Sequence, residues 1–145
     1  MQKLTRILFL TILMSVFPLH GNSYAASEKN CPTITDAAIK ARFKVEKVSD
    51  DLWQVLGPNG PFYVEEEREL CLFTLSANMS SFLADLDEAG DVWASFSIRY
   101  GNFYSRNGKV YYEQVVVLPY GSSETFAETL KFFVEVANLI IEDAA

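Results

Sequence analysis

The sequence predicts an α+β fold in which an antiparallel sheet carries helices on one face. The pair Asn107-Gly108 between two β-rich runs is the strongest short-range signal for a β-hairpin. Two further short predicted strands, 51–57 and 61–67, flank a Gly-Pro-Asn-Gly turn, and the chain closes with a long amphipathic stretch at 122–145. Together these features predict the element order α-β-β-β-α-β-β-α.

The first predicted helix covers 33–43. Thr33 is a suitable N-cap and Asp36 suits the first turn, while Ile34, Ala38 and Ala41 recur at helical spacing. Three predicted strands follow, of which the third, 69–77, is nearly continuously apolar. Such a run is typical of a strand in the middle of a sheet.

The second predicted helix covers 79–96. Its apolar residues follow one another at spacings of 4, 3, 4 and 3, which makes one helical stripe: Phe82, Leu86, Ala89, Trp93 and Phe96. Gly90 interrupts the pattern, so we expect the helix to end or bend there, with Asp91 capping a second short piece.

The hairpin register follows from a two-residue turn at Asn107-Gly108. Arg106 pairs with Lys109, and outward from there Tyr104 faces Tyr111, Phe103 faces Tyr112, and Tyr100 faces Val115. One face of the hairpin is then core-like: Phe103, Val110, Tyr112, Val116 and Leu118. The other face is aromatic and polar together: Tyr100, Asn102, Tyr104, Tyr111, Glu113, Val115 and Val117.

The tyrosines of that second face, Tyr100, Tyr104 and Tyr111, are the first candidate partner-binding residues. Tyrosine is enriched at interfaces because its ring is apolar and its hydroxyl hydrogen-bonds. The alternative is that they form the outer face of a two-sided sheet, without a partner.

The last predicted helix, 122–145, is apolar around most of its circumference. Its polar residues make one narrow stripe: Glu124, Glu128, Lys131, Glu135, Asn138 and Glu142. A surface helix ordinarily buries an arc of about 100°, so a second apolar flank needs cover. Phe132, Val136 and Leu139 are therefore expected to meet a second subunit or a partner protein, or else to lie under one of the other helices.

The N-terminus has the order of a secretory signal. Lys3 and Arg6 precede an apolar run at 7–19, and small residues follow. We expect cleavage after Ala25, which leaves 26–145 as one domain outside the cytoplasm, periplasmic or secreted. The apolar run is shorter than the roughly 20 residues that a membrane span needs, so no membrane association is expected after cleavage.

Composition narrows the function classes. Removing 1–25 changes the formal net charge from −7 to −9, which disfavours nucleic acid as a partner. The single histidine, His20, lies in the predicted signal. The mature chain would then lack histidine general bases, Ser-His-Asp triads and histidine-ligated zinc, and no cofactor is expected.

The two cysteines, Cys31 and Cys71, predict a disulfide, because an even count in an oxidising compartment favours pairing. Two free thiols or a nucleophile are the alternatives. A nucleophile is the least favoured, since no histidine is present to activate it.

Two acidic clusters lie at 65–69 and 85–91. In the second, Asp85, Asp87 and Gly90 match three positions of a calcium-binding loop, but Phe96 stands where a bidentate glutamate is required. We therefore expect no metal site. Paired carboxylates could still act as general acid and base, which keeps a small carboxylate-dependent hydrolase as an alternative.

The element order, together with the motifs of the C-terminal half, resembles the YbjN domain family, and the layout is similar to that of type III secretion chaperones. The resemblance rests on Trp93, on the step Arg99-Tyr100-Gly101, on the Asn107-Gly108 turn, on Glu113 in the following strand, and on the aromatic last helix. It covers about 33–142 and is strongest from 93 to 134. The resemblance implies a dimer-forming, protein-binding module without established catalytic residues.

The sequence thus predicts an exported, non-catalytic, chaperone-like module that binds protein, including a second copy of itself. An exported enzyme inhibitor or immunity-type protein is the alternative within the binding class.

Overall fold

The computed structural model describes residues 30–96 and 100–145, so the predicted signal lies outside the described residues. The α+β class is confirmed, and the element order follows the predicted one with one additional strand. The helices are α2 (Ile34–Ala41), α3 (Leu86–Ser95) and α4 (Ser123–Ala144), with a short 3-10 turn η2 (Arg68–Leu70). The strands are β1 (Lys44–Lys47), β2 (Leu52–Gly57), β3 (Gly60–Glu67), β4 (Leu72–Asn78), β5 (Asn102–Arg106) and β6 (Lys109–Val117).

The strands form one antiparallel sheet in the order β1-β2-β3-β4-β6-β5. The additional strand is β1, whose four residues Lys-Val-Glu-Lys place three charges on one edge. Its single apolar residue gives almost no alternation, so the sequence pattern does not reveal it. The nearly continuous apolar run of β4 lies between β3 and β6, as predicted.

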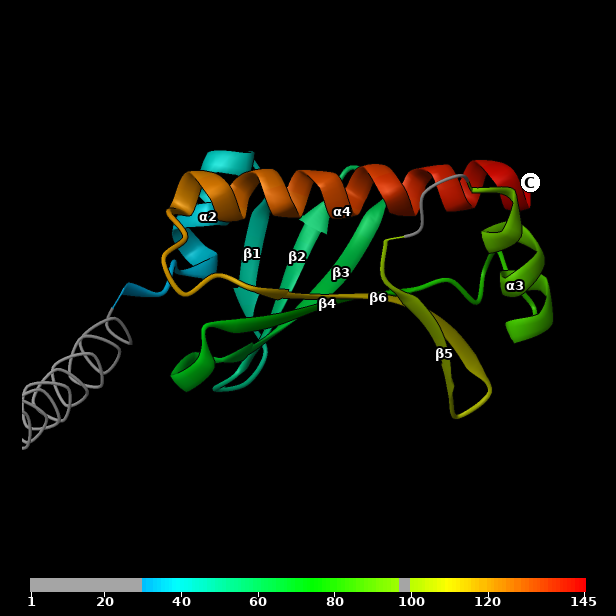
Figure 1. Ribbon diagram of the computed structural model, residues 1–145, viewed down its shortest axis with the longest axis horizontal. Coiled ribbons are helices and arrows are strands. Elements are labelled where there is room, and N and C mark those ends of the chain that lie inside the picture. The colour runs from blue at the N-terminus through cyan, green and yellow to red at the C-terminus, as the bar shows by residue number, and fades with distance from the viewer. Residues whose placement is uncertain (1–29, 97–99) are drawn as a thin grey trace, which may run out of the picture.

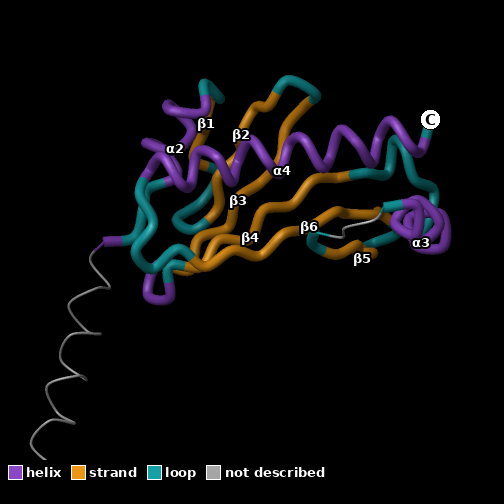
Figure 2. Tube along the Cα trace, turned by 45° about the horizontal axis from the view of Figure 1, so that its top comes forward, coloured by secondary structure: helices purple, strands orange, loops and turns teal. Residues whose placement is uncertain are grey.

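One face of the sheet is covered by helices. Figure 1 shows α4 lying across the strands with α2 beside its first turns, while α3 lies beyond the end of the sheet near β5. Figure 2 shows the same layering in a tilted view, with the strands curving beneath α4. The core lies between α4 and the sheet, and its largest fully buried side chains are Tyr112, Phe126, Phe133, Ile34, Leu75, Met79, Leu83, Leu130 and Ile140.

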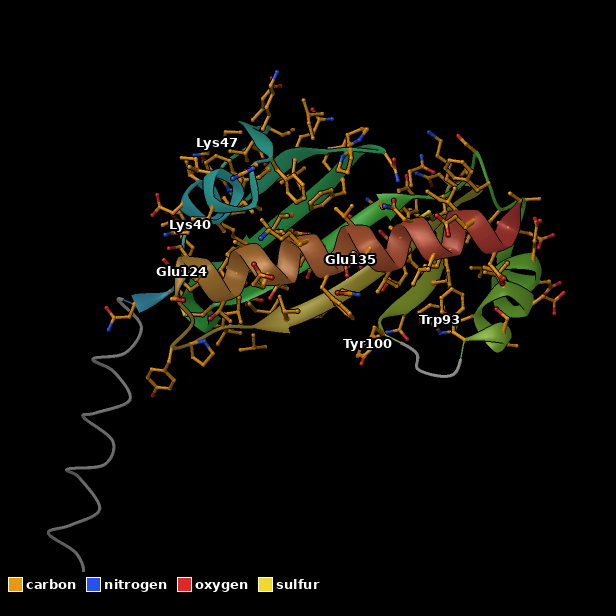
Figure 3. The ribbon with its side chains drawn as sticks, turned by 90° about the horizontal axis from the view of Figure 1, so that it is seen from above. Lys40, Lys47, Trp93, Tyr100, Glu124 and Glu135 are labelled. Atoms are coloured by element: carbon orange, nitrogen blue, oxygen red, sulfur yellow. A yellow bond between two sulfur atoms is a disulfide. The ribbon has the colours of Figure 1, made fainter. Side chains whose placement is uncertain are left out.

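The N-termini of α2 and α4 are both capped by hydroxyl side chains. Thr33 accepts a hydrogen bond from the amide of Asp36, and Ser122 accepts one from the amide of Thr125. Where the two helices adjoin, Lys40 bridges to Glu124 at 2.5 Å (Figure 3). The hydrogen bond from Lys40 is the main reason that the pKa of Glu124 falls to about 2.

The second helix is shorter than the sequence pattern predicts. It begins at Leu86 because Asp85 accepts a hydrogen bond from the amide of Glu88, while the Glu88 carboxylate accepts one from the amide of Ala84. The sequence predicts that the helix ends or bends at Gly90. The helix does not end there, because α3 continues through Gly90 to Ser95. Beyond it, Trp93 packs edge-on against Phe103, with 5.3 Å between ring centroids.

The disulfide prediction is confirmed in the structure. Cys31 and Cys71 are bonded, with 5.3 Å between their Cα atoms. The bond ties the segment before α2 to the start of β4, and it is consistent with an oxidising compartment. Within 30–96 and 100–145, no helix is long and apolar enough to cross a membrane.

Candidate partner-binding surfaces

The sheet face opposite α4 carries no covering element within the described residues (Figure 1). Its side chains alternate with the buried ones along each strand, and across the middle of the sheet the pairing aligns Gln54, Tyr63, Ser76, Glu113 and Asn102 in one row. The face is therefore built from tyrosine, amide, hydroxyl and carboxylate groups. We call it the open face.

Two of the three predicted tyrosines meet on the open face. Tyr104 and Tyr111 are directly paired across the hairpin, as predicted, and their rings stack with 5.1 Å between centroids and 12° between planes. Partial burial raises the pKa of the Tyr104 phenol, and the neighbouring Glu113 carboxylate raises it further. Both side chains are partly exposed on this face.

The open face is hollowed around these tyrosines. A depression of about 770 Å³ is lined by side chains of five strands and their turns, among them Tyr63, Ser76, Asn78, Tyr104 and Tyr111. Gln54 donates a hydrogen bond to the Tyr63 hydroxyl at 3.2 Å, which fixes one phenol in place. Charges of both signs border the hollow: Asp51, Glu65, Glu113, Arg106 and Lys109.

Tyr100 does not join the other two tyrosines, and its predicted pairing with Val115 is wrong. Strand β5 begins at Asn102, and Gly101 turns the chain out of the strand with a φ of 82°. The Tyr100 ring instead lies edge-on against Phe132 of α4, with 4.8 Å between centroids. This contact with α4 places the ring on the helix side of the sheet, away from the open face.

The apolar flank of α4 is narrower than the sequence predicts. Val136 is only 5% exposed and belongs to the core of the chain, so it is not available to a partner. Phe132 and Leu139 are 37% and 50% exposed. Val136 is therefore covered within the chain, whereas Phe132 and Leu139 remain candidates for an interface.

A second depression lies at the sheet edge beneath that flank. It has a volume of about 790 Å³ and is bordered by Tyr100, Gln114, Val116, Thr129 and Phe132. The sequence pattern does not reveal it. The hairpin pattern does not show that β5 is shorter than β6, which is the feature that opens this edge.

No cluster of histidine, cysteine and carboxylate side chains that could hold a metal ion occurs within the described parts of the chain. Comparison of the chain with family models, curated proteins and solved structures finds no match. The resemblance to the YbjN domain family therefore stays a prediction.

Proposed function

We propose that this chain is an exported, non-catalytic protein-binding module, with the open face as its contact surface and a capacity for self-association. The observation that carries the proposal is the stacked pair Tyr104 and Tyr111 on a hollowed sheet face that no described element covers. Tyrosine is enriched at protein interfaces because its rigid ring is apolar and its hydroxyl hydrogen-bonds, and the polar groups around the pair suit the rim of an interface.

Export is supported by the signal-like N-terminus and by the disulfide between Cys31 and Cys71. The periplasm and the extracellular space both accommodate the disulfide. N-terminal sequencing of the protein from its native host tests the proposal: we expect Ala26 as the first residue, and an intact Met1 would contradict export.

Partner binding is tested by placing a photoreactive phenylalanine analogue at Tyr104 in the native host. Irradiation should yield a discrete crosslinked species, and Tyr111→Ala in the same chain should weaken it by removing the stacking partner. The analogue at Asp87, an exposed residue at the start of α3, is the control. Equal crosslinking from both positions, or none from Tyr104, would contradict the open face as contact surface.

The hydrolase alternative has one supporting observation, because Asp51, Glu65 and Glu113 all border the hollow. Replacing Glu65 and Glu113 with glutamine separates the two functions. Binding through tyrosine rings should survive the double substitution, whereas carboxylate-dependent hydrolysis should be lost.

A further inference from the structure

The outer edge of β6 has a stretch without a strand partner in the described part of the chain. Strand β5 pairs with β6 from Lys109 to Glu113 only, while β6 continues to Val117. On its other side β6 pairs with β4 along Tyr111 to Val117. We call the unpaired side of Val115–Val117 the free edge.

Neighbouring hydrogen bonds show in which direction the backbone N–H and C=O groups of Val115–Val117 point. Val110 accepts from the Met79 amide at 2.8 Å, and Leu118 donates to the Cys71 carbonyl at 2.9 Å. Both bonds lie on the β4 side, and the direction alternates along an antiparallel strand. The N–H and C=O groups of Val115 and Val117 consequently point away from β4, toward the free edge.

Strand β1 and the free edge of β6 differ in how well they are protected against pairing with another strand. Strand β1 bears Lys44, Glu46 and Lys47, which are charges of the kind that discourage edge-to-edge pairing. The free edge consists of three valines, and Val115 and Val117 are 54% and 55% exposed. An uncharged, β-branched edge with available backbone donors and acceptors is a template for another strand.

We propose that the free edge of β6 binds the free edge of a second copy, in an antiparallel register centred on Val116. Val115 of each copy then lies opposite Val117 of the other, and the two residues exchange backbone hydrogen bonds. The inference rests on the self-association in the proposed function and supplies its site. It does not involve the open-face tyrosines.

The ends of the free edge favour a second copy over an unrelated strand. At one end Asn102 of β5 occupies the edge beside Glu113, so an incoming strand must stop before that position. In the register centred on Val116, the residue that arrives there is Pro119, which lacks the N–H needed to continue pairing. A register centred on Val115 also keeps the faces aligned, but it would place Val117 opposite Glu113, where Asn102 already lies.

The helix side of the edge also suits a second copy. Val116 lines the depression beside Thr129 and Phe132. The Val116 side chain of the second copy would therefore contact a largely apolar surface. The nearest acidic side chain on α4 that lines it, Glu128, is paired with Lys131 at 2.7 Å. Two acidic chains would thus meet along a strip with little uncompensated charge.

The first test is sedimentation equilibrium of the purified protein with Val115→Pro. Proline at 115 removes an amide that points to the free edge, a position that edge strands tolerate. The wild type should be a dimer, and the variant should be a monomer with unchanged circular dichroism. Val116→Pro is the matched control, since its amide points to β4 and its loss should unfold the sheet. Should Val115→Pro fail to fold, Val117→Lys carries the same test, because a lysine on an exposed strand edge discourages edge-to-edge pairing.

The second test is a crosslink at the proposed axis. In this register the two Val116 residues face each other as a pair without hydrogen bonds, with Cα atoms about 4.5 Å apart, which is within disulfide range. Val116→Cys should therefore form a disulfide between copies, whereas Thr74→Cys, one strand inward on the open face, should not.

A wild-type protein that stays monomeric at high concentration would overturn both the inference and the self-association. A dimer that survives Val115→Pro and Val117→Lys, or that does not crosslink through Val116→Cys, would overturn the inference alone. Crosslinking from Tyr104 in the monomeric Val115→Pro variant would show that partner binding by the open face is separate.

Discussion

The hydroxyl of Tyr112 donates a hydrogen bond of 2.5 Å to the carbonyl oxygen of Tyr100. The same hydroxyl accepts a hydrogen bond from the Gln114 amide, also at 2.5 Å, in the interior. This pair of bonds holds the chain just before β5 against the helix side of the sheet. It is one reason that Tyr100 leaves the open face and that β5 begins only at Asn102, which exposes the free edge of β6.

Replacing Tyr112 with phenylalanine should lower the free energy of unfolding by about 1–3 kcal/mol, because the Gln114 amide and the Tyr100 carbonyl lose their shared partner. Urea unfolding measures the change. Tyr111→Phe is the control, since that ring lies half-buried on the open face, and we expect a change within about 0.5 kcal/mol. Equal effects from both substitutions would show that the buried network contributes nothing specific.

The pH dependence of the unfolding free energy should reflect the ionisation of the Tyr112 hydroxyl. Burial raises the pKa of Tyr112 to about 12, from an ordinary value of 10. The unfolded chain therefore loses this proton first, and stability that is complete below pH 10 falls as the pH rises toward 12. The difference in unfolding free energy between the wild type and Tyr112→Phe should shrink across that interval, and a constant difference would contradict the assignment.

The sequence predicts the hairpin register well because an Asn-Gly turn fixes pairing locally. It does not predict the position of Tyr100, which depends on the positive φ of Gly101 and on a hydrogen bond from Tyr112, twelve positions later. The exposed flank of α4 is missed for a related reason. A helix that is apolar nearly all round does not show which flank the sheet will cover, so Val136 and Phe132 cannot be told apart.

Gly101→Ala should displace β5 from β6. A Cβ at this position would lie 2.1 Å from the backbone carbonyl oxygen of Glu113, and the φ of 82° is already unfavourable for alanine. We expect a loss of roughly 2–3 kcal/mol in unfolding free energy. Gly108→Ala is the matched control: its φ is 71°, with nothing within 4 Å of the added Cβ. It should cost only about 1 kcal/mol.

The disulfide should be quantitative in the exported protein and should stabilise it. Mass spectrometry without reduction should detect the Cys31–Cys71 crosslink and no free thiol. The bond closes a loop with a sequence separation of 40, which corresponds to about 4 kcal/mol in the chain-entropy model. The double variant Cys31→Ser with Cys71→Ser should unfold at correspondingly lower urea, and an unchanged midpoint would show that the bond does not constrain the unfolded chain.

A carboxylate introduced on the buried side of α4 should have a different effect from one introduced on its exposed side. Val136→Glu places a carboxylate in the core, where an unpaired charge costs several kcal/mol, so it should unfold the chain or lower its thermal midpoint steeply. Leu139→Glu adds the same group at a half-exposed position and should leave circular dichroism and the midpoint nearly unchanged. If α4 reached a partner through Val136, the first variant would remain folded and only lose its partner. A folded, monomeric Val136→Glu protein would therefore show that the core assignment of this residue is wrong.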